Sequence, residues 1–229
     1  MKPIVYIISA PSGSGKSTLV NELRKLVREL DFSISYTTRR PRGSEQNGRE
    51  YFFVPVEDFE RMIRAGEFLE HACVFGNYYG TAKRFLREAE EHGHDLLLDI
   101  DVQGAAQIKK QIPDAVSVFI LPPDKQTLEW RLRHRSQDSE PVIHKRLVAA
   151  AKEIENYPEY DYILINDRLE QSIDELKAIV LSERLRRSQA RLSPAETEIV
   201  ATAERCLLPN VRQRLRPILA SFAVSVTST

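Results

Sequence analysis

Residues 10–18 read A-P-S-G-S-G-K-S-T, and this stretch decides the fold of the chain. It matches the phosphate-binding loop G-x-x-x-x-G-K-[ST] except at Ala10, where the pattern has glycine. This departure matters only if the position requires a positive φ. An apolar, β-branched run precedes the loop at 4–8, and Leu and Val repeat at helical spacing over 19–30. A phosphate-binding loop requires this strand and helix, which disfavours the alternative of a functionless serine-glycine turn.

The residues of the loop suit the triphosphate of a nucleotide. Gly13 and Gly15 allow backbone N–H groups to turn toward phosphate oxygens. Lys16 has the reach to contact the β- and γ-phosphates, and the Ser17 hydroxyl can ligate Mg²⁺. Thr18 begins a helix whose positive end faces the anion.

The composition is that of a soluble globular protein. Among 229 residues, 33 lysines and arginines balance 33 aspartates and glutamates, whereas a nucleic-acid-binding domain is usually basic. Two cysteines, Cys73 and Cys206, provide no disulfide framework, and this favours a reducing compartment. No apolar run approaches the roughly 18 residues of a membrane span. We expect a cytoplasmic protein that binds neither nucleic acid nor membrane. Whether it is a monomer or a homo-oligomer stays open.

The chain alternates apolar strands with helical patterns. Such alternation predicts an α/β fold with a parallel sheet flanked by helices on both faces. The further strands are expected at 96–100, 116–121 and 162–166, and the helices near 102–111, 124–135, 141–156 and 170–190.

Residues 33–82 break this alternation. Short aromatic and β-branched pieces surround one helical pattern at about 56–65. We predict an inserted subdomain with its own small, largely antiparallel sheet. Beyond about residue 190, Ser193-Pro194 with Glu196 resembles a helix start, and residues 218–229 are apolar and strand-like. The tail carries no motif that indicates its role.

Two aspartates follow the predicted strand at 96–100. Asp99 lies at the carboxyl edge of the parallel sheet, where a carboxylate is suited to hold Mg²⁺ or its waters. Asp101 comes two residues later, on the same side of the strand. For either aspartate taken alone, the alternative to a role in the site is that it caps the helix at 102–111.

Two arginine groups indicate an acceptor that is itself phosphorylated. The segment T-T-R-R-P-R suits binding of a second phosphate group, with a solvated basic loop as the alternative. Arg131 and Arg135 share a predicted helix face, and Arg146 lies on the next helix. Surface charge is their alternative role, but a kinase needs such cations to screen charge during phosphoryl transfer. The N-K-x-D motif of GTPases is absent, and the five histidines show no metal-site spacing.

Taken in order, these motifs closely resemble the bacterial guanylate kinase family. The likeness runs from about residue 3 to about residue 190. The matching stretches are A-P-S-G-S-G-K-S-T, S-Y-T-T-R-R-P-R, G-R-E-Y-F-F-V, F-L-E-H-A, V-F-G-N-Y-Y-G-T, L-L-L-D-I-D-V-Q-G-A, R-L-R-H-R, K-R-L and I-N-D.

The resemblance implies a P-loop NTPase-type fold in three parts and transfer of the ATP γ-phosphoryl group to GMP, with Mg²⁺, giving ADP and GDP. The implied parts are a nucleotide core at 1–32 and 83–190, a GMP-binding insert at 33–82 and a helical lid within about 122–157, followed by an extension at 191–229 of unknown role.

The resemblance also implies residue roles. The ATP site would comprise Gly13, Ser14, Gly15, Lys16, Ser17, Thr18, Asn166 and Asp167, the last two bordering adenine. The GMP phosphate would be held by Arg39, Arg42, Tyr51 and Tyr79, and the base would face Ser35, Glu70 and Thr81, with Asp101 also on the GMP side. The catalytic group would be Lys16, Arg42, Arg135 and Arg146, with Ser17 and Asp99 at Mg²⁺.

The chain departs from the family where His134 and Ser136, rather than glycines, flank Arg135. This difference suggests a stiffer lid. Two other functions stay open: a non-catalytic guanylate-kinase-like interaction module, and a P-loop kinase for another small phosphorylated acceptor. Retention of Lys16 and Arg146 argues against the first, and Glu70 argues against the second.

Overall fold

The computed structural model describes residues 2–135, 139–189 and 191–223, with the side chain of Arg135 outside the described part. The chain divides into two compact units. The first comprises Met1–Ile7 and Arg28–Val116, and the second comprises Ile8–Val27 and Ser117–Thr229.

A five-stranded sheet has the order β2-β7-β1-β8-β9. Its strands are β1 (Val5–Ser9), β2 (Leu30–Ser33), β7 (Asp95–Asp99), β8 (Val116–Leu121) and β9 (Tyr162–Ile165). The pairs β2–β7 and β8–β9 are parallel, so the predicted parallel sheet is confirmed. β2 was not among the predicted strands. It lies at the sheet edge and is only partly buried, so it lacks the continuous apolar run that marks the other four.

The first unit also contains the predicted small sheet. Its order is β4-β3-β6-β5, formed by β3 (Tyr36–Thr37), β4 (Phe52–Phe53), β5 (Phe68–Val74) and β6 (Asn77–Ala82). β6 pairs antiparallel with β3 and β5, whereas β3 and β4 are parallel. The short helix α2 (Val56–Arg64) buries Phe59, whose ring stacks on Phe68 at 4.5 Å and on Tyr78 at 5.3 Å between centroids. A mostly antiparallel insert is therefore confirmed.

Two helices follow the insert in the same unit. α4 (Val102–Gln111) was predicted, and α3 (Lys83–His92) was not. α3 buries Phe85 and Ala89, four residues apart, which is a narrow apolar face on a mostly charged helix.

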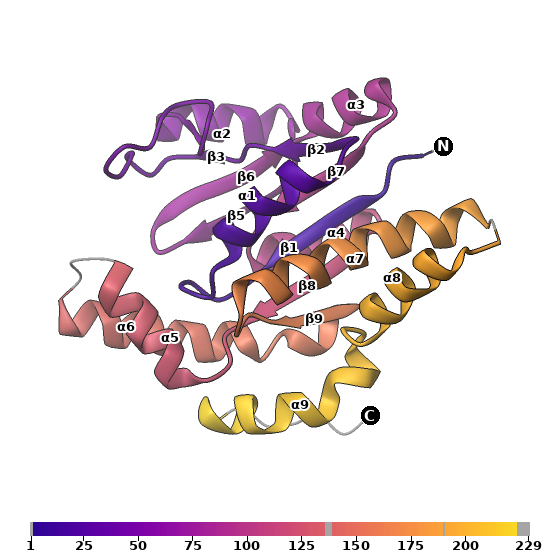
Figure 1. The fold of residues 1–229 in the computed structure, drawn as a ribbon. Helices are drawn as coiled ribbons and strands as arrows, with labels where there is room; N and C mark the ends of the chain where they lie inside the picture. The colour runs from indigo at the N-terminus through magenta and orange to yellow at the C-terminus, as the bar shows by residue number, and fades with distance from the viewer. Residues whose placement is uncertain (1, 136–138, 190, 224–229) are drawn as a thin grey trace. The chain divides into compact units, whose positions relative to one another are not determined.

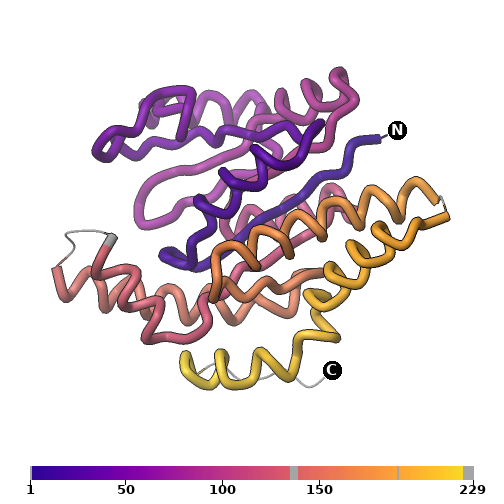
Figure 2. Tube along the Cα trace, in the orientation of Figure 1, coloured from indigo at the N-terminus to yellow at the C-terminus, as the bar shows by residue number. Residues whose placement is uncertain are grey.

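The second unit contains the remaining helices of the described ranges. These are α1 (Lys16–Leu26), α5 (Lys125–Arg135), α6 (Glu140–Ile154), the 3₁₀ turn η1 (Tyr157–Glu159), α7 (Leu169–Ser188), α8 (Pro194–Glu204) and α9 (Leu208–Ser221). α7 and α8 lie side by side as a helical hairpin, and α9 packs against β9 (Figures 1 and 2). None of the helices in these ranges combines the length and apolar character needed to cross a bilayer.

The C-terminal segment corrects one expectation and confirms another. Ser193 caps α8 through a capping box with Glu196, as its sequence predicted. The strand expected from residue 218 onward is wrong as far as Ser221, because this part belongs to α9. Buried Leu215, Ile218 and Leu219 recur at helical spacing and place one apolar face of α9 inward. Residues 224–229, the rest of that predicted strand, lie outside the described part.

Candidate functional site

The phosphate-binding loop has the backbone conformation that its glycines predict. Gly13 and Gly15 have φ of 96° and 91°, and α1 begins at Lys16 with Gly15 as its N-cap. A Cβ on Gly15 would lie 2.3 Å from Asn166 Nδ2, and one on Gly13 would lie 2.8 Å from Leu132 Cδ2. The positive φ therefore favours glycine at both positions, and a side chain at either would displace a neighbouring one.

Ala10 does not require the freedom of a glycine. In the described part of the chain, the non-glycine residues with positive φ are Glu29, Phe75, Gln189 and Ala223. Ala10 is not among them, so replacement of the first glycine of the motif leaves the backbone unstrained.

Asn166 connects β9 to the loop. Its Nδ2 donates to Ser14 O at 2.7 Å, and its backbone N donates to Leu121 O at 2.8 Å. Arg131 on α5 donates through Nη2 to Asn166 O at 2.9 Å. Burial lowers the pKa of Arg131, while Asp167 and Asp124 act in the opposite direction. The geometry adds Arg131 to the predicted site, as a positioning residue for the loop and for Asn166.

One of the two predicted lid arginines contacts the loop. Arg146 on α6 donates through Nη2 to Ser12 Oγ at 2.6 Å. The backbone of Arg135 ends α5, but its side chain and all of Ser136 lie outside the described part. His134 stacks on Trp130 with 4.2 Å between ring centroids, so its imidazole packs along α5. The structure thus brings Arg146 to the predicted ATP site and does not test Arg135.

In the first unit, Glu70 is a buried carboxyl group. It lies on β5 opposite Thr81 of β6, and the exposed fractions of the two residues are 4% and 0%. Burial raises the pKa of Glu70 to about 7; Thr81 acts in the opposite direction, and Asp101 raises it further. Gly104 leaves room for this side chain, since a Cβ there would lie 2.4 Å from Glu70 Oε2. Ser35, also predicted to face the base, is buried.

Arg39 lies in an aromatic and acidic cluster. Its Nη2 donates to Glu45 Oε1 at 3.0 Å, and its Cζ lies 5.3 Å from the centroid of the Tyr51 ring. Tyr51 and Tyr79 pack edge to face at 5.9 Å. Burial lowers the pKa of Arg39, but its contacts with Glu45 and Tyr79 outweigh this, and the pKa is raised. Three of the four predicted phosphate ligands are therefore together, and the fourth, Arg42, is exposed nearby in sequence.

Asp99 and Asp101 occupy different positions at the end of β7. Asp99 is the last residue of the strand, as predicted. Asp101 is the N-cap of α4, where its Oδ1 accepts from Gly104 N at 2.9 Å. The capping alternative therefore holds for Asp101, whose contact with GMP stays a prediction.

Comparison with known proteins identifies the family of the chain. Residues 1–183 match the family model described as guanylate kinase. The chain belongs to the guanylate kinase family. The guanylate kinase of Koribacter versatilis is 58% identical over 225 residues, which cover 97% of each chain. That of Escherichia coli strain K12 is 49% identical over 189 residues, covering 82% of this chain and 91% of the relative.

A solved structure confirms the fold of this guanylate kinase family member. The crystal structure of guanylate kinase from Anaplasma phagocytophilum superposes with a TM-score of 0.66 at 34% identity. The superposition covers 82% of this chain and 87% of the other. An α/β P-loop kinase fold with a small, mostly antiparallel insert is thus established.

Proposed function

We infer that this chain is a guanylate kinase, which transfers the γ-phosphoryl group of ATP to GMP and so produces ADP and GDP. The observation that carries this function is the buried Glu70 carboxyl group opposite Thr81, in a unit that also gathers Arg39, Tyr51 and Tyr79. A carboxylate beside hydroxyls reads a guanine edge, and an arginine–tyrosine cluster holds a phosphate. The product, GDP, places the enzyme in purine nucleotide metabolism, and we propose that it works in the cytoplasm.

GMP would be recognised at its two ends. Glu70 accepts hydrogen bonds from guanine N1–H and the 2-amino group, while the Ser35 and Thr81 hydroxyls donate to O6. Arg39 and Tyr51 hold the phosphate, together with Arg42 and Tyr79. Asp101 caps α4 and contributes negative charge on the GMP side. Because the second pKa of a phosphate monoester is about 6, the acceptor oxygen is ionised near neutrality and needs no general base.

ATP would be bound by the loop of the second unit. The backbone N–H groups at 13–18 surround its phosphates, and Lys16 contacts the β- and γ-phosphates. Asn166 and Asp167 border the adenine. Arg146, held at the loop by Ser12, stabilises the charge of the transferring group, and we propose the same role for Arg135.

Two oxygen donors fit the Mg²⁺ that ATP carries. Ser17 is the second residue of α1, and Asp99 is the last residue of β7, which are positions where P-loop enzymes hold the ion directly or through waters. When bound, Mg²⁺ neutralises charge on the β- and γ-phosphates.

We propose the following domain organisation. The nucleotide core comprises 1–32 and 83–190, the GMP-binding insert 33–82, and the lid lies within about 122–157, where α5 and α6 are found. Residues 191–229 form an extension outside the catalytic domain.

Product analysis tests this function. The full chain with ATP, GMP and Mg²⁺ should form ADP and GDP in equal amounts, and with ATP alone it should form neither GDP nor more than a trace of ADP. A non-catalytic module would give no ADP with any acceptor. A kinase for another acceptor would give ADP only with a compound such as a sugar phosphate. Either result would overturn the proposed function.

A further inference from the structure

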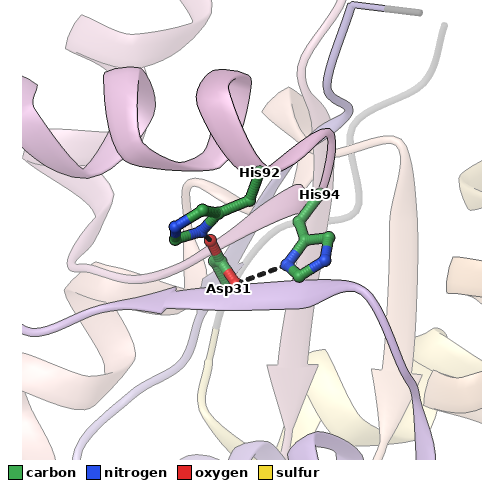
Figure 3. A group of neighbouring side chains, drawn as sticks. All are labelled: Asp31, His92 and His94. Carbon is green, nitrogen blue, oxygen red and sulfur yellow. Dashed lines mark hydrogen bonds and ion pairs between the residues drawn. The ribbon is translucent and has the colours of Figure 1, made fainter.

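The side chains of Asp31, His92 and His94, all in the first unit, point toward one another (Figure 3). His92 Nδ1 lies 2.8 Å from Asp31 Oδ2, and His94 Nδ1 lies 2.9 Å from Asp31 Oδ1. Within the described ranges, these three form the one cluster of metal-ligating side chains whose donor atoms all lie within 4.8 Å of one another. None of them belongs to the proposed ATP or GMP sites.

The backbone of all three residues is held by secondary structure and by a hydrogen-bonded turn. Asp31 is on β2 and pairs with Leu96 of β7, so it lies beside the start of that strand. His92 ends α3, and Gly93 turns the chain with φ of 71°, so that His94 N donates to Ala89 O at 3.0 Å. The turn H-G-H therefore presents both imidazoles to the same carboxylate.

We propose that Asp31, His92 and His94 form a binding site for a divalent transition-metal ion of the Zn²⁺ class. Two imidazoles and one carboxylate are a donor set that such ions take, with water completing the coordination. Ligand distances near 2.0–2.2 Å place the donor atoms of one ion about 3.3 Å apart. The two nitrogen–oxygen distances, 2.8 and 2.9 Å, are shorter than this, and all donor atoms lie within 4.8 Å of one another, so side-chain rotations can place them around one ion.

Solvent access and charge both favour a cation here. The exposed fractions of the side chains are 29% for Asp31, 58% for His92 and 36% for His94, so an ion can enter and keep water ligands. Glu88 and Glu91 on α3 add negative potential at His92. Mg²⁺ is not the expected ion, because it prefers oxygen ligands and this site offers two nitrogens.

The alternative is a purely structural network in which both imidazoles donate to Asp31. Such a network needs a proton on each Nδ1, whereas metal binding needs the Nδ1 lone pairs. Added metal should therefore change the state of the histidine ring nitrogens if the cluster binds it, and should leave them unchanged if the cluster is a purely structural network.

A metal at this site would link the two chain segments that flank the GMP-binding insert. Asp31 lies just before the insert begins at residue 33, and α3, which ends in His92, starts directly after β6. An ion held by both segments favours the folded unit, because the unfolded chain does not present the three ligands together. Zn²⁺ should therefore raise the Tm of the protein.

Calorimetric titration of the full chain with Zn²⁺, without nucleotide, tests the proposal. We expect one ion per chain, and at least about 10-fold weaker binding in Asp31→Asn, His92→Ala and His94→Ala. His144→Ala, on the exposed face of α6, and Cys73→Ser, which removes an exposed thiol, are the matched controls and should leave affinity unchanged. Zn²⁺ should raise the Tm of wild type but not of His92→Ala.

A measurement on the wild-type chain covers the case in which a variant fails to fold. The imidazole ¹⁵N resonances of His92 and His94 should shift on addition of Zn²⁺, while those of His71, His134 and His144 stay in place. Absence of binding, binding retained in the three ligand variants, equal loss in His144→Ala, or unshifted His92 and His94 resonances would each overturn the proposal.

Discussion

Burial of Glu70 opposes its ionisation, so this residue links stability to pH. Its pKa in the folded chain is raised from 4.5 to about 7, mainly because the carboxyl group is desolvated. Between these two values the folded state binds more protons than the unfolded state. The contribution of Glu70 is thus present at low pH and is lost as pH rises from about 4.5 to about 7.

Replacement of Glu70 by Gln should remove this dependence. Without nucleotide, the free energy of unfolding of wild type relative to Glu70→Gln should fall by up to about 3 kcal/mol between pH 5 and pH 7.5. Denaturant unfolding followed by circular dichroism measures it at each pH. Glu67→Gln, at an exposed position three residues away, is the control and should track wild type. A difference between wild type and Glu70→Gln that does not change with pH would show that Glu70 ionises normally.

Lys16 opens α1, where the loop ends, and we predict that its charge acts on the transferring phosphoryl group. Lys16→Met should lower kcat by about 10²-fold or more, because removal of one preorganised charge at the reacting group has effects of this size. Lys25→Met, at an exposed position on the same helix, should leave kcat unchanged. Steady-state kinetics checks both. Near-normal turnover in a folded Lys16→Met protein would refute the assignment.

Single residues differ in how far sequence reveals them. Gly13, Gly15 and Lys16 belong to one short motif, and both glycines have a positive φ that glycine adopts readily. Glu70 was identified through family resemblance, because a lone glutamate in a strand carries no local signal. The histidines showed no metal-site spacing in the sequence, because His92 and His94 provide only two ligands and Asp31 lies about sixty residues earlier, so only folding brings the three together.

At the scale of elements, long apolar patterns were predictable and marginal ones were not. β7, β8 and β9 are continuous apolar runs buried in the sheet, so sequence located them within a residue or two. β2 and α3 expose much of their surface and carry charges, which weakens the periodic signal. The last part of α9, from residue 218, was predicted as a strand, because a short apolar run is compatible with either a helix or a strand.

The extension after α7 covers an edge of the large sheet. Ile163 N donates to Cys206 O at 2.7 Å, Leu208 N donates to Asp161 O at 3.1 Å, and α9 buries Val211 among its apolar residues. These contacts protect β9, which is an end strand of the sheet.

Deletion of residues 191–229 should therefore reduce stability and leave the chemistry intact. The loss of several buried aliphatic side chains costs at least about 2 kcal/mol, or roughly 4–8 °C in Tm for a chain of this size. The kcat of the folded, truncated enzyme should stay within about threefold of wild type. Differential scanning calorimetry and steady-state kinetics measure the two effects. Loss of kcat with fold and assembly unchanged would contradict this view of the extension.

For the whole molecule, the residues proposed for the two substrates fall mainly into separate compact units. The loop, Arg146 and Asn166 belong to the second, while Arg39 and Glu70 belong to the first. Each unit therefore holds most of the residues proposed to bind one of the two substrates. The sequence placed the loop motif and the arginine–tyrosine segment in different stretches of the chain, whereas the boundaries of core and insert stay a prediction, since the first unit also includes residues 83–116. It did not predict the packing of Glu70 against Gly104, which arises only when β5 and α4 meet.

The most direct test of the account is the kcat/KM for GMP, IMP and AMP, with wild type and Glu70→Gln. A site built to hydrogen-bond a group rejects analogues that lack it by roughly 10⁴-fold or more. We expect wild type to favour GMP over AMP by that order, with IMP between them because it retains N1–H and O6 but lacks the 2-amino group. Glu70→Gln should lose efficiency with GMP, since an amide cannot accept from both donors. Equal use of AMP and GMP by wild type, or unchanged GMP efficiency in Glu70→Gln, would contradict the account.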